Sequence, residues 1–307
     1  MKINLVEEIA EAMNLAPIAL FVYKRPWHVE QTIEALKRNR LAQRSELFIF
    51  SDGPKSEVDK KGVINTREYI KSISGFKAIH IIARDCNWGL ANSVISGVTE
   101  LCCKFGRVIV LEDDLIVSPL FLDFMNDALD KYASVERVMQ VSGYMFPVNV
   151  QSDADAVLLP FTTSWGWATW QRAWGHFDRN TRDYEKLKLN KSLRNSFNLN
   201  GAYPYFNMLR DQREGKVDSW AILWYLKVFF LSGLALFPAK TLVQNIGLDG
   251  SGTHCIKGGK DGIIDTSFRV TIYPQTIECD DAAKNKIFSY LAHRNSLICR
   301  VREKFRG

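Results

Sequence analysis

Three consecutive carboxylates, Glu112, Asp113 and Asp114, follow the most apolar strand that the sequence predicts, Arg107 to Leu111. Like charges this close raise one another's pKa unless a cation lies between them, and the triplet contains no cationic residue. Oxygen-only ligands suit Mg²⁺ or Mn²⁺, which take one or two carboxylates together with phosphate oxygens of a substrate. The triplet therefore predicts a site for Mn²⁺ or Mg²⁺ and a diphosphate. The alternative is an acidic loop in which Asp114 opposes the dipole of a helix that Pro119 opens.

Polar residues also follow three earlier predicted strands. Arg25 and Asp52 come after the first two of these strands, and Arg84 comes after the third. Ligands of an open α/β sheet bind at the carboxyl ends of its strands, so these side chains are expected to converge. Arg25 suits a phosphate, and Asp52 could accept a hydrogen bond from a base N–H or a ribose hydroxyl. The alternative for Asp52 is a simple Asp-Gly-Pro turn.

The elements that position these residues alternate between strand and helix patterns. Strands are expected at 17–23, 46–51, 78–83 and 107–111, and helices at 29–38, 57–72, 90–104 and 119–132. This rhythm predicts an α/β fold with a mostly parallel sheet flanked by helices. The second half is less regular, with strands expected at 138–142 and 156–161 and no assignment for 183–203. The apolar stretch 221–237 is interrupted by Lys227 and predicts a buried helix that ends near Ser232, followed by a short strand.

Composition limits the classes of function. Apolar residues make up 47% of the 307 residues, which argues against disorder, and a net charge of +6 is too small to indicate a nucleic-acid partner. The six cysteines form no CxxC pair, which argues against a zinc ribbon and favours reduced thiols. Glu7, Glu8 and Glu11 interrupt the N-terminal segment, so no secretory signal is expected and the predicted location is cytoplasmic.

Several segments together resemble the GT-A glycosyltransferases. More narrowly, they resemble bacterial sugar transferases that build surface polysaccharide such as lipopolysaccharide and, distantly, the Golgi N-acetylglucosaminyltransferase that initiates complex N-glycans. The resemblance covers roughly Pro17 to His254. The segments are FVYKRP (21–26), FSDGP (50–54), RDCNWGLANSV (84–94), VIVLEDDL (108–115), SWGWATW (164–170), VDSWAILW (217–224) and FPAKTLVQNIGLDGSGTH (237–254).

The resemblance implies a Rossmann-like GT-A fold that binds a nucleotide-diphosphate sugar across the first four strand ends. It places Asp52 at the base, Arg25 at the diphosphate and Asp114 on the metal. It implies that Glu112 and Asp113 meet ribose, donor sugar or metal-bound water. The remaining donor-binding residues are Tyr23, Arg84, Asn87, Gly89, Asn92, Trp165 and Gly166. Asp85 departs from the Golgi enzyme, which has a histidine there, and this leaves the choice of base open.

The resemblance also implies a general base and a second metal-side residue. Asp218, before a tryptophan motif, maps to the base that deprotonates the acceptor hydroxyl, and the alternative is a helix N-cap. His254 maps to a contact with the diphosphate or the metal. Trp165 and Gly166 precede a segment in which Trp167, Trp170 and Trp174 have helical spacing, and they are expected to meet the sugar.

The predicted function is a metal-dependent, inverting transfer of a sugar, expected from a UDP-sugar, to a hydroxyl of a glycan or lipid-linked glycan. The transferred group would be a hexose or an N-acetylhexosamine. One alternative is a sugar-nucleotide nucleotidyltransferase, although the segment after the first strand lacks the glycine-rich loop such enzymes need. The other is a carbohydrate-binding or nucleotide-sugar-binding protein without catalysis.

One catalytic domain is expected over residues 1–283, with a nucleotide-binding half at about 15–118 and an acceptor-side half at about 119–283. Residues 284–307 form a basic, amphipathic tail. Such a tail could lie peripherally on an anionic membrane surface, or its apolar side could pack on the domain.

Overall fold

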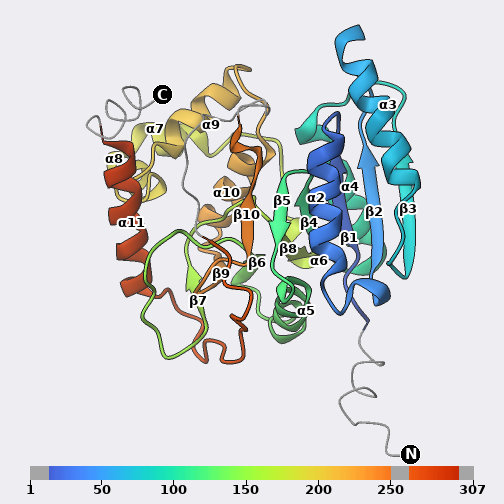
Figure 1. Cartoon of the computed structure of the whole chain (residues 1–307). Coiled ribbons are helices and arrows are strands. Elements are labelled where there is room, and N and C mark those ends of the chain that lie inside the picture. The colour runs from blue at the N-terminus through green and yellow to red at the C-terminus, as the bar shows by residue number, and fades with distance from the viewer. Residues whose placement is uncertain (1–13, 250–262, 297–307) are drawn as a thin grey trace, which may run out of the picture.

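The structure, a computed structural model, describes residues 14–249 and 263–296 and has an eight-stranded mixed sheet at its centre (Figure 1). The strand order is β3-β2-β1-β4-β8-β6-β9-β7. Six strands run in one direction, and only β8 and β7 oppose them. The strands are β1 (Ile18–Val22), β2 (Glu46–Ser51), β3 (Ala78–Ala83), β4 (Arg107–Glu112), β6 (Val138–Ser142), β7 (Ala156–Leu159), β8 (Trp167–Trp170) and β9 (Leu234–Pro238). The α/β class with a mostly parallel sheet is thus confirmed.

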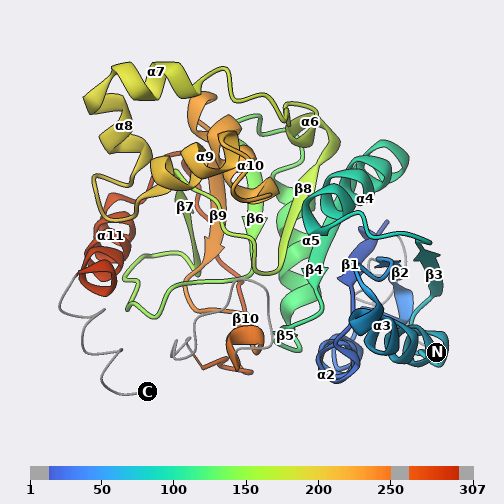
Figure 2. The same ribbon diagram turned by 90° about the horizontal axis from the view of Figure 1, so that it is seen from above.

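Helices cover both faces of this sheet. Figure 2 shows α4 and α10 on one side and α2 and α3 on the other. The helices are α2 (Pro26–Lys37), α3 (Glu57–Lys71), α4 (Leu90–Phe105), α5 (Phe121–Lys131), α6 (Gln171–Trp174), α7 (Tyr184–Leu189), α8 (Lys191–Phe197), α9 (Tyr205–Arg213), α10 (Trp220–Phe230) and α11 (Asp281–Asn295), with 3-10 turns η1 (Ala42–Arg44) and η2 (Gly247–Asp249). A separate antiparallel pair joins β5 (Leu115–Val117) to β10 (Val243–Asn245). Among the described residues, no helix combines the length and apolar composition that crossing a membrane requires.

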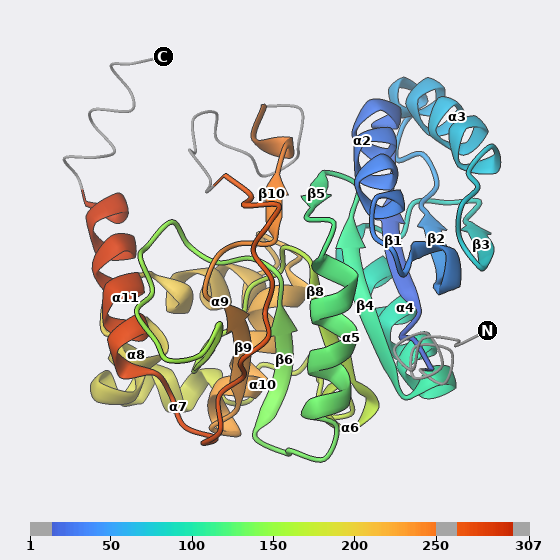
Figure 3. The ribbon, with the colours of Figure 1, turned by 60° about the horizontal axis from the view of Figure 1, so that its bottom comes forward.

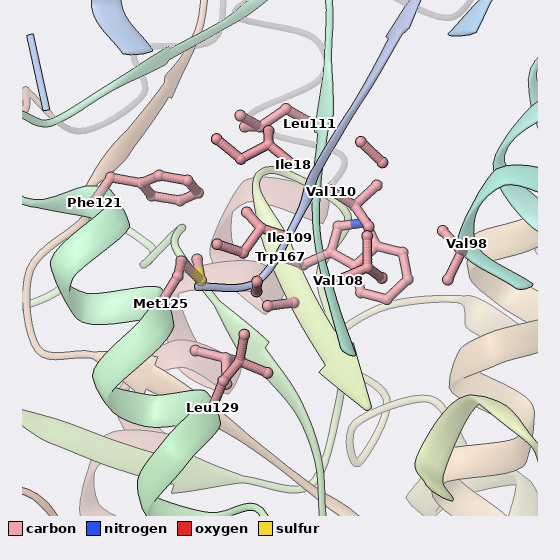
Figure 4. Packing of buried hydrophobic residues seen from close by; sticks show 14 of the residues in the cluster. Ile18, Val98, Val108, Ile109, Val110, Leu111, Phe121, Met125, Leu129 and Trp167 are labelled. Atoms are coloured by element: carbon pink, nitrogen blue, oxygen red, sulfur yellow. The ribbon is translucent and has the colours of Figure 1, made fainter. Parts of the chain in front are cut away.

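The main core lies around β4, which explains why the middle of this strand is apolar. Val108 to Leu111 are buried, since α4 covers one face of the strand and α5 covers the other. Figure 4 shows Phe121, Met125 and Leu129 of α5 on one side of β4 and Val98 of α4 on the other side. The strand that ends in the acidic triplet is therefore held firmly in place.

The second half of the chain differs from the expected pattern at its tryptophans. Trp167 to Trp170 form strand β8 rather than a helix, and only Trp174 lies in a helical turn, α6. The prediction was wrong because β8 runs between β4 and β6 and is buried at every position, so apolar residues need not alternate. The expected buried helix and following strand in 221–237 are confirmed as α10 and β9. The unassigned segment 183–203 forms α7 and α8.

The expected domain boundary at 283/284 falls in the first turn of α11. Ala283, Ile287 and Leu291 of this helix are buried in a second apolar cluster with Phe197 and Phe161. In Figures 1 and 3 the helix lies beside α8 at the outer edge of the molecule. Of the two expectations for the apolar side of the tail, packing on the domain is therefore the one observed up to residue 296. Residues 297–307 lie outside the described part of the chain.

Candidate active site

The register of the sheet brings the carboxyl ends of four strands to one edge. Phe21 of β1 pairs with Glu112 of β4, and Val22 of β1 pairs with Ser51 of β2. Ser51 in turn pairs with Ala83, the last residue of β3. Arg25, Asp52, Arg84 and the acidic triplet therefore emerge at the same edge of the sheet, as expected from their places after the strands.

Arg25 neutralises two of the three carboxylates. Its Nη2 donates to Oδ1 of Asp113 and to Oδ2 of Asp114, the latter at 2.8 Å. Burial opposes the charged guanidinium, but the two aspartates outweigh this effect and raise the pKa of Arg25. The triplet therefore has a cationic partner, which comes from 88 residues earlier in the chain. Sequence inspection of the triplet alone missed this partner.

Glu112 is the carboxyl group of the triplet that Arg25 does not contact directly. Its side chain forms no hydrogen bond or ion pair with the described residues. Burial, followed by the charges of Asp114 and Asp113, raises the pKa of Glu112 to about 8. Burial also raises the pKa of Asp113, although Arg25 opposes the shift. Three carboxyl groups thus share one guanidinium, and the raised pKa of Glu112 means that this group keeps its proton near neutral pH unless a cation binds beside it.

Helix α2 packs against this edge with polar side chains. Oγ1 of Thr32 donates to the carbonyl oxygen of Asp113 at 2.9 Å. Nε2 of His28 lies 3.2 Å from Oδ2 of Asp249, although not in the direction of a hydrogen bond. Within the described residues, Nε2 of His28 and Nη1 of Arg25 are both buried without a hydrogen-bond partner. Nη1 of Arg25 therefore has a free donor position beside the acidic edge as far as the described residues go, whereas Nε2 of His28 has its ion-pair contact with Asp249.

The turn η2 covers Asp114 from the other side. The backbone N–H of Ile246 donates to the carbonyl oxygen of Asp114 at 2.9 Å. A Cβ atom at Gly247 would lie 2.1 Å from Oδ2 of Asp114, so only glycine fits there without moving the carboxylate. This role of Gly247 was not predicted, although the residue lies inside the quoted 237–254 motif. His254 lies outside the described residues, and its contact with the metal or diphosphate stays a prediction.

Asp52 is engaged within the protein. Its Oδ1 accepts hydrogen bonds from the N–H groups of Gly53 and Trp88, at 2.9 and 2.8 Å. Its Oδ2 accepts from Nδ2 of Asn87 at 3.0 Å and from the N–H of Gly89 at 2.9 Å. Asp52 therefore ties the end of β2 to the loop before α4. Asp52, Asn87 and Gly89 are brought together as expected, but through contacts with one another, and their contact with a nucleotide stays a prediction.

Two arginines, Arg84 and Arg67, form hydrogen bonds near the carboxyl ends of β2 and β3. Arg84 is buried, its guanidinium lies 3.7 Å from the ring centre of Trp88, and its Nη1 donates to Oγ of Ser93 at 3.0 Å. Burial lowers the pKa of Arg84. Arg67 of α3, which the sequence analysis did not single out, donates to the carbonyl oxygens of Ser51, Asp52 and Arg84. Arg67 thus joins the carboxyl ends of β2 and β3.

Two other predicted donor residues, Tyr23 and Asn92, lie around these elements. The hydroxyl of Tyr23 accepts a hydrogen bond from the N–H of Lys55 at 2.8 Å, which orients it toward the loop after β2. Asn92 borders a groove of about 710 Å³ along α4, together with Asn87 and Trp88. Its amide is held by the carbonyl oxygen of Trp88 and by Arg179.

Trp165 and Gly166 lie before β8 and not before a helix. The ring of the half-buried Trp165 packs edge-on against Tyr144, at 4.6 Å between centres. Gly166 has a φ of 59°, and a Cβ there would lie 2.8 Å from Val243 of β10. Glycine is therefore required at 166 by backbone conformation and by close packing with β10. Contact of either residue with a sugar stays a prediction.

Asp218 is exposed and stands just before α10. The N-cap is Ser219, whose side chain accepts from the N–H of Ile222, so Asp218 is not needed for capping. The ring of Trp220 stacks on Trp167, at 4.9 Å between centres. Because Trp167 pairs with Val110 of β4, the start of α10 lies near the strand end that carries the acidic triplet.

The donor atoms at the edge suit a hard divalent cation. Within residues 14–249 and 263–296, no three His, Cys, Asp or Glu side chains are arranged as a ready-made metal site. Mg²⁺ and Mn²⁺ sites at substrate phosphates need only one or two carboxylates from the protein. The buried Glu112 beside Asp113 and Asp114 fits such a cation, provided that Glu112 gives up its proton and Arg25 gives up part of its contact.

No protein-family model and no curated protein matches the chain. Solved structures with a similar fold include TarS of S. aureus, with 10% sequence identity and a TM-score of 0.41, over 74% of this chain and 36% of that one. A mannosyltransferase from Pyrobaculum calidifontis, solved with GDP-Man and Mn²⁺, has 11% identity and a TM-score of 0.35, over 53% of this chain and 49% of that one.

Glucosyl-3-phosphoglycerate synthase from Mycobacterium tuberculosis, solved with Mn²⁺, UDP-glucose and phosphoglyceric acid, has 13% identity and a TM-score of 0.31, over 51% of this chain and 57% of that one. The chain spans from 36% to 57% of the length of these three structures. The likeness concerns the fold alone.

Proposed function

We propose that the protein is a metal-dependent glycosyltransferase that moves a sugar from a nucleotide-diphosphate sugar to a hydroxyl group of a glycan. One observation carries the proposal: the acidic end of β4 lies beside two buried nitrogen atoms, of Arg25 and His28, that have no hydrogen-bond partner among the described residues. Carboxylates for a cation next to donors for an anion are what a metal–diphosphate ligand requires.

The donor diphosphate would bind at the start of α2. Its oxygen atoms would accept hydrogen bonds from Nη1 of Arg25 and, where the ring carries the proton, from Nε2 of His28. Mn²⁺ or Mg²⁺, held by Asp114 with Asp113 and Glu112 beside it, would neutralise the leaving nucleoside diphosphate as a Lewis acid. The nucleoside would extend toward the loop that Asp52 holds, where Trp88 is exposed. We expect a UDP-sugar as the donor.

The acceptor would bind near the start of α10. Asp218 would take the proton of the acceptor hydroxyl while the oxygen attacks C1 of the donor sugar. The bond from C1 to the phosphate oxygen breaks with its electron pair going to the nucleoside diphosphate. One such displacement inverts the configuration at C1. The exposure of Asp218 and its absence from the helix cap support this role, because its oxygen atoms are not used by α10.

The proposal is tested by incubating the purified protein with UDP-, GDP- and dTDP-sugars and Mn²⁺ and measuring the nucleoside diphosphate released by slow hydrolysis. Release that needs Mn²⁺ is expected. Release of pyrophosphate from a nucleoside triphosphate and a sugar 1-phosphate would instead identify a nucleotidyltransferase. Binding of a donor without any turnover, with or without glycan acceptors, would identify a binding protein.

We further propose a glycan or lipid-linked glycan as the acceptor, and a cytoplasmic protein that touches an anionic membrane only peripherally. Of the tail lysines, Lys284 is paired with Asp281, and Lys286 donates to Asn149 and Gln151. The membrane contact would therefore depend on the basic residues after α11. Co-sedimentation with anionic vesicles, reduced by salt and by removal of residues 297–307, is expected, and equal binding to neutral vesicles would contradict it.

A further inference from the structure

We propose that Arg25 is an internal counter-ion that occupies Asp113 and Asp114 in the ligand-free protein, and that a bound diphosphate draws it away and so opens both carboxylates to the divalent cation. This proposal rests on the proposed function, in which the site binds both a divalent cation and a nucleotide diphosphate. The cation and the nucleotide diphosphate are then expected to strengthen each other's binding.

The two terminal nitrogen atoms of the Arg25 guanidinium have different contacts. Nη2 is shared between Oδ1 of Asp113 and Oδ2 of Asp114, whereas Nη1 of the same group is buried without a hydrogen bond among the described residues. The side chain of Arg25 is only 18% exposed, and those of the two aspartates are 7% and 10% exposed. Charges this buried need partners, because water does not solvate them. Arg25 thus supplies charge that a bound cation would otherwise supply.

A cation on Asp114 would compete with Arg25 for the same atoms. Oδ2 of Asp114 is 2.8 Å from Nη2 of Arg25, so a cation bound to this oxygen would be repelled by the guanidinium. The backbone of Gly247 closes on the same oxygen, which leaves the carboxylate little room to turn away. Arg25 is the group that can move, because it has a long, flexible side chain.

A diphosphate offers Arg25 another partner close by. The guanidinium is planar and binds phosphate oxygens through two parallel hydrogen bonds, and the unpartnered Nη1 already provides one of the two donors. When Arg25 turns to the phosphate, Asp113 and Asp114 lose their counter-ion and gain affinity for the cation. By linkage, the cation then strengthens diphosphate binding by the same factor.

A purely structural ion pair would behave differently, and the chain offers a matched example. Arg40 pairs with the buried Asp123 after the end of α2 and contacts none of the acidic triplet. Arg40→Gln therefore removes an arginine–aspartate pair, with a more exposed arginine than Arg25, without freeing Asp113 or Asp114.

The test is a titration of the full chain with Mn²⁺, following free Mn²⁺ by electron paramagnetic resonance, with and without UDP and corrected for the Mn²⁺–UDP complex. In the wild type, UDP is expected to tighten Mn²⁺ binding about tenfold, within the usual range of such coupling. Arg25→Gln is expected to bind Mn²⁺ about tenfold more tightly than the wild type without UDP, and to lose the effect of UDP. Arg40→Gln should match the wild type.

Unchanged or weaker Mn²⁺ binding by Arg25→Gln without UDP would overturn the counter-ion role. Arg25→Met, which keeps the apolar stem, replaces it if the glutamine variant does not fold by circular dichroism. Tighter Mn²⁺ binding in the variant, with no UDP, GDP or dTDP binding to either protein, would support the counter-ion and contradict the proposed function.

Discussion

Gly247 lies so close to Asp114 that a Cβ atom at position 247 would stand 2.1 Å from the carboxylate oxygen Oδ2. The backbone between β10 and η2 therefore closes directly on the end of β4, and the small sheet of β5 and β10 holds it there. The position of the Asp114 carboxylate therefore depends on a residue that has no side chain.

Gly247→Ala is expected to keep the fold and to weaken Mn²⁺-dependent UDP binding at least about tenfold. The added methyl group must push the Asp114 carboxylate aside, since that carboxylate is the nearest group. Isothermal titration with UDP and Mn²⁺ measures the effect. Gly175→Ala adds a methyl group at a site whose nearest neighbour is 3.1 Å away and serves as the control. Normal binding by Gly247→Ala would show that the carboxylate can turn without loss.

Asp218→Asn is expected to reduce the turnover rate by about 10²–10⁴-fold, the usual effect of losing a general base, while donor affinity stays the same. Asparagine keeps the shape of the side chain but cannot take a proton. The helix start is unaffected because Ser219 is the cap. Single-turnover rates and UDP affinity together decide the matter, and near-normal turnover would remove Asp218 from the catalytic mechanism.

Asp52→Asn is expected to lower the free energy of unfolding in urea by about 2–4 kcal/mol. The buried carboxylate of Asp52 accepts hydrogen bonds from several N–H groups, and the amide nitrogen of asparagine cannot accept any of them. Asp85→Asn changes an exposed carboxylate of the same loop and should have little effect. If Asp52→Asn is fully stable and only loses nucleotide binding, Asp52 is a ligand contact and not a support of the loop.

Cysteine reactivity should follow burial. Burial raises the pKa of the Cys102 thiol to about 12, and since only the thiolate reacts, Cys102 should resist alkylation at pH 8. Cys86 and Cys103 are exposed and should react readily. Iodoacetamide labelling followed by peptide mass spectrometry measures this, with urea-unfolded protein as the control. Rapid labelling of Cys102 in the folded protein would mean that α4 opens far more often than its packing implies.

The strands on the nucleotide-binding side and the place of the acidic triplet could be predicted from the sequence. The bounds of β2 and β3 match the expected 46–51 and 78–83, and the acidic triplet does end a buried strand, because a strand covered on both faces must be apolar throughout. The tryptophans of β8 were wrongly predicted to be helical. A fully buried strand shows no alternation of apolar and polar residues, so the spacing of the tryptophans resembled that of a helix.

Long-range partners could not be predicted. Arg25 stands 88 residues before Asp113, and only the pairing of β1 with β4 brings them together. His28 and Asp249 meet across a longer stretch of chain, and Arg67 reaches strand ends that precede and follow it. Composition and spacing along the chain contain no information on such contacts, so the counter-ion of the triplet was missed.

The most direct test of the central claim is UDP binding with and without Mn²⁺ in the wild type and in Asp114→Ala. If the acidic end of β4 holds the cation, Mn²⁺ strengthens UDP binding by the wild type, and Asp114→Ala folds normally but loses most of this enhancement together with sugar transfer. Binding of UDP that depends on Mn²⁺ equally in both proteins would contradict the assignment of the acidic strand end as the metal–diphosphate site.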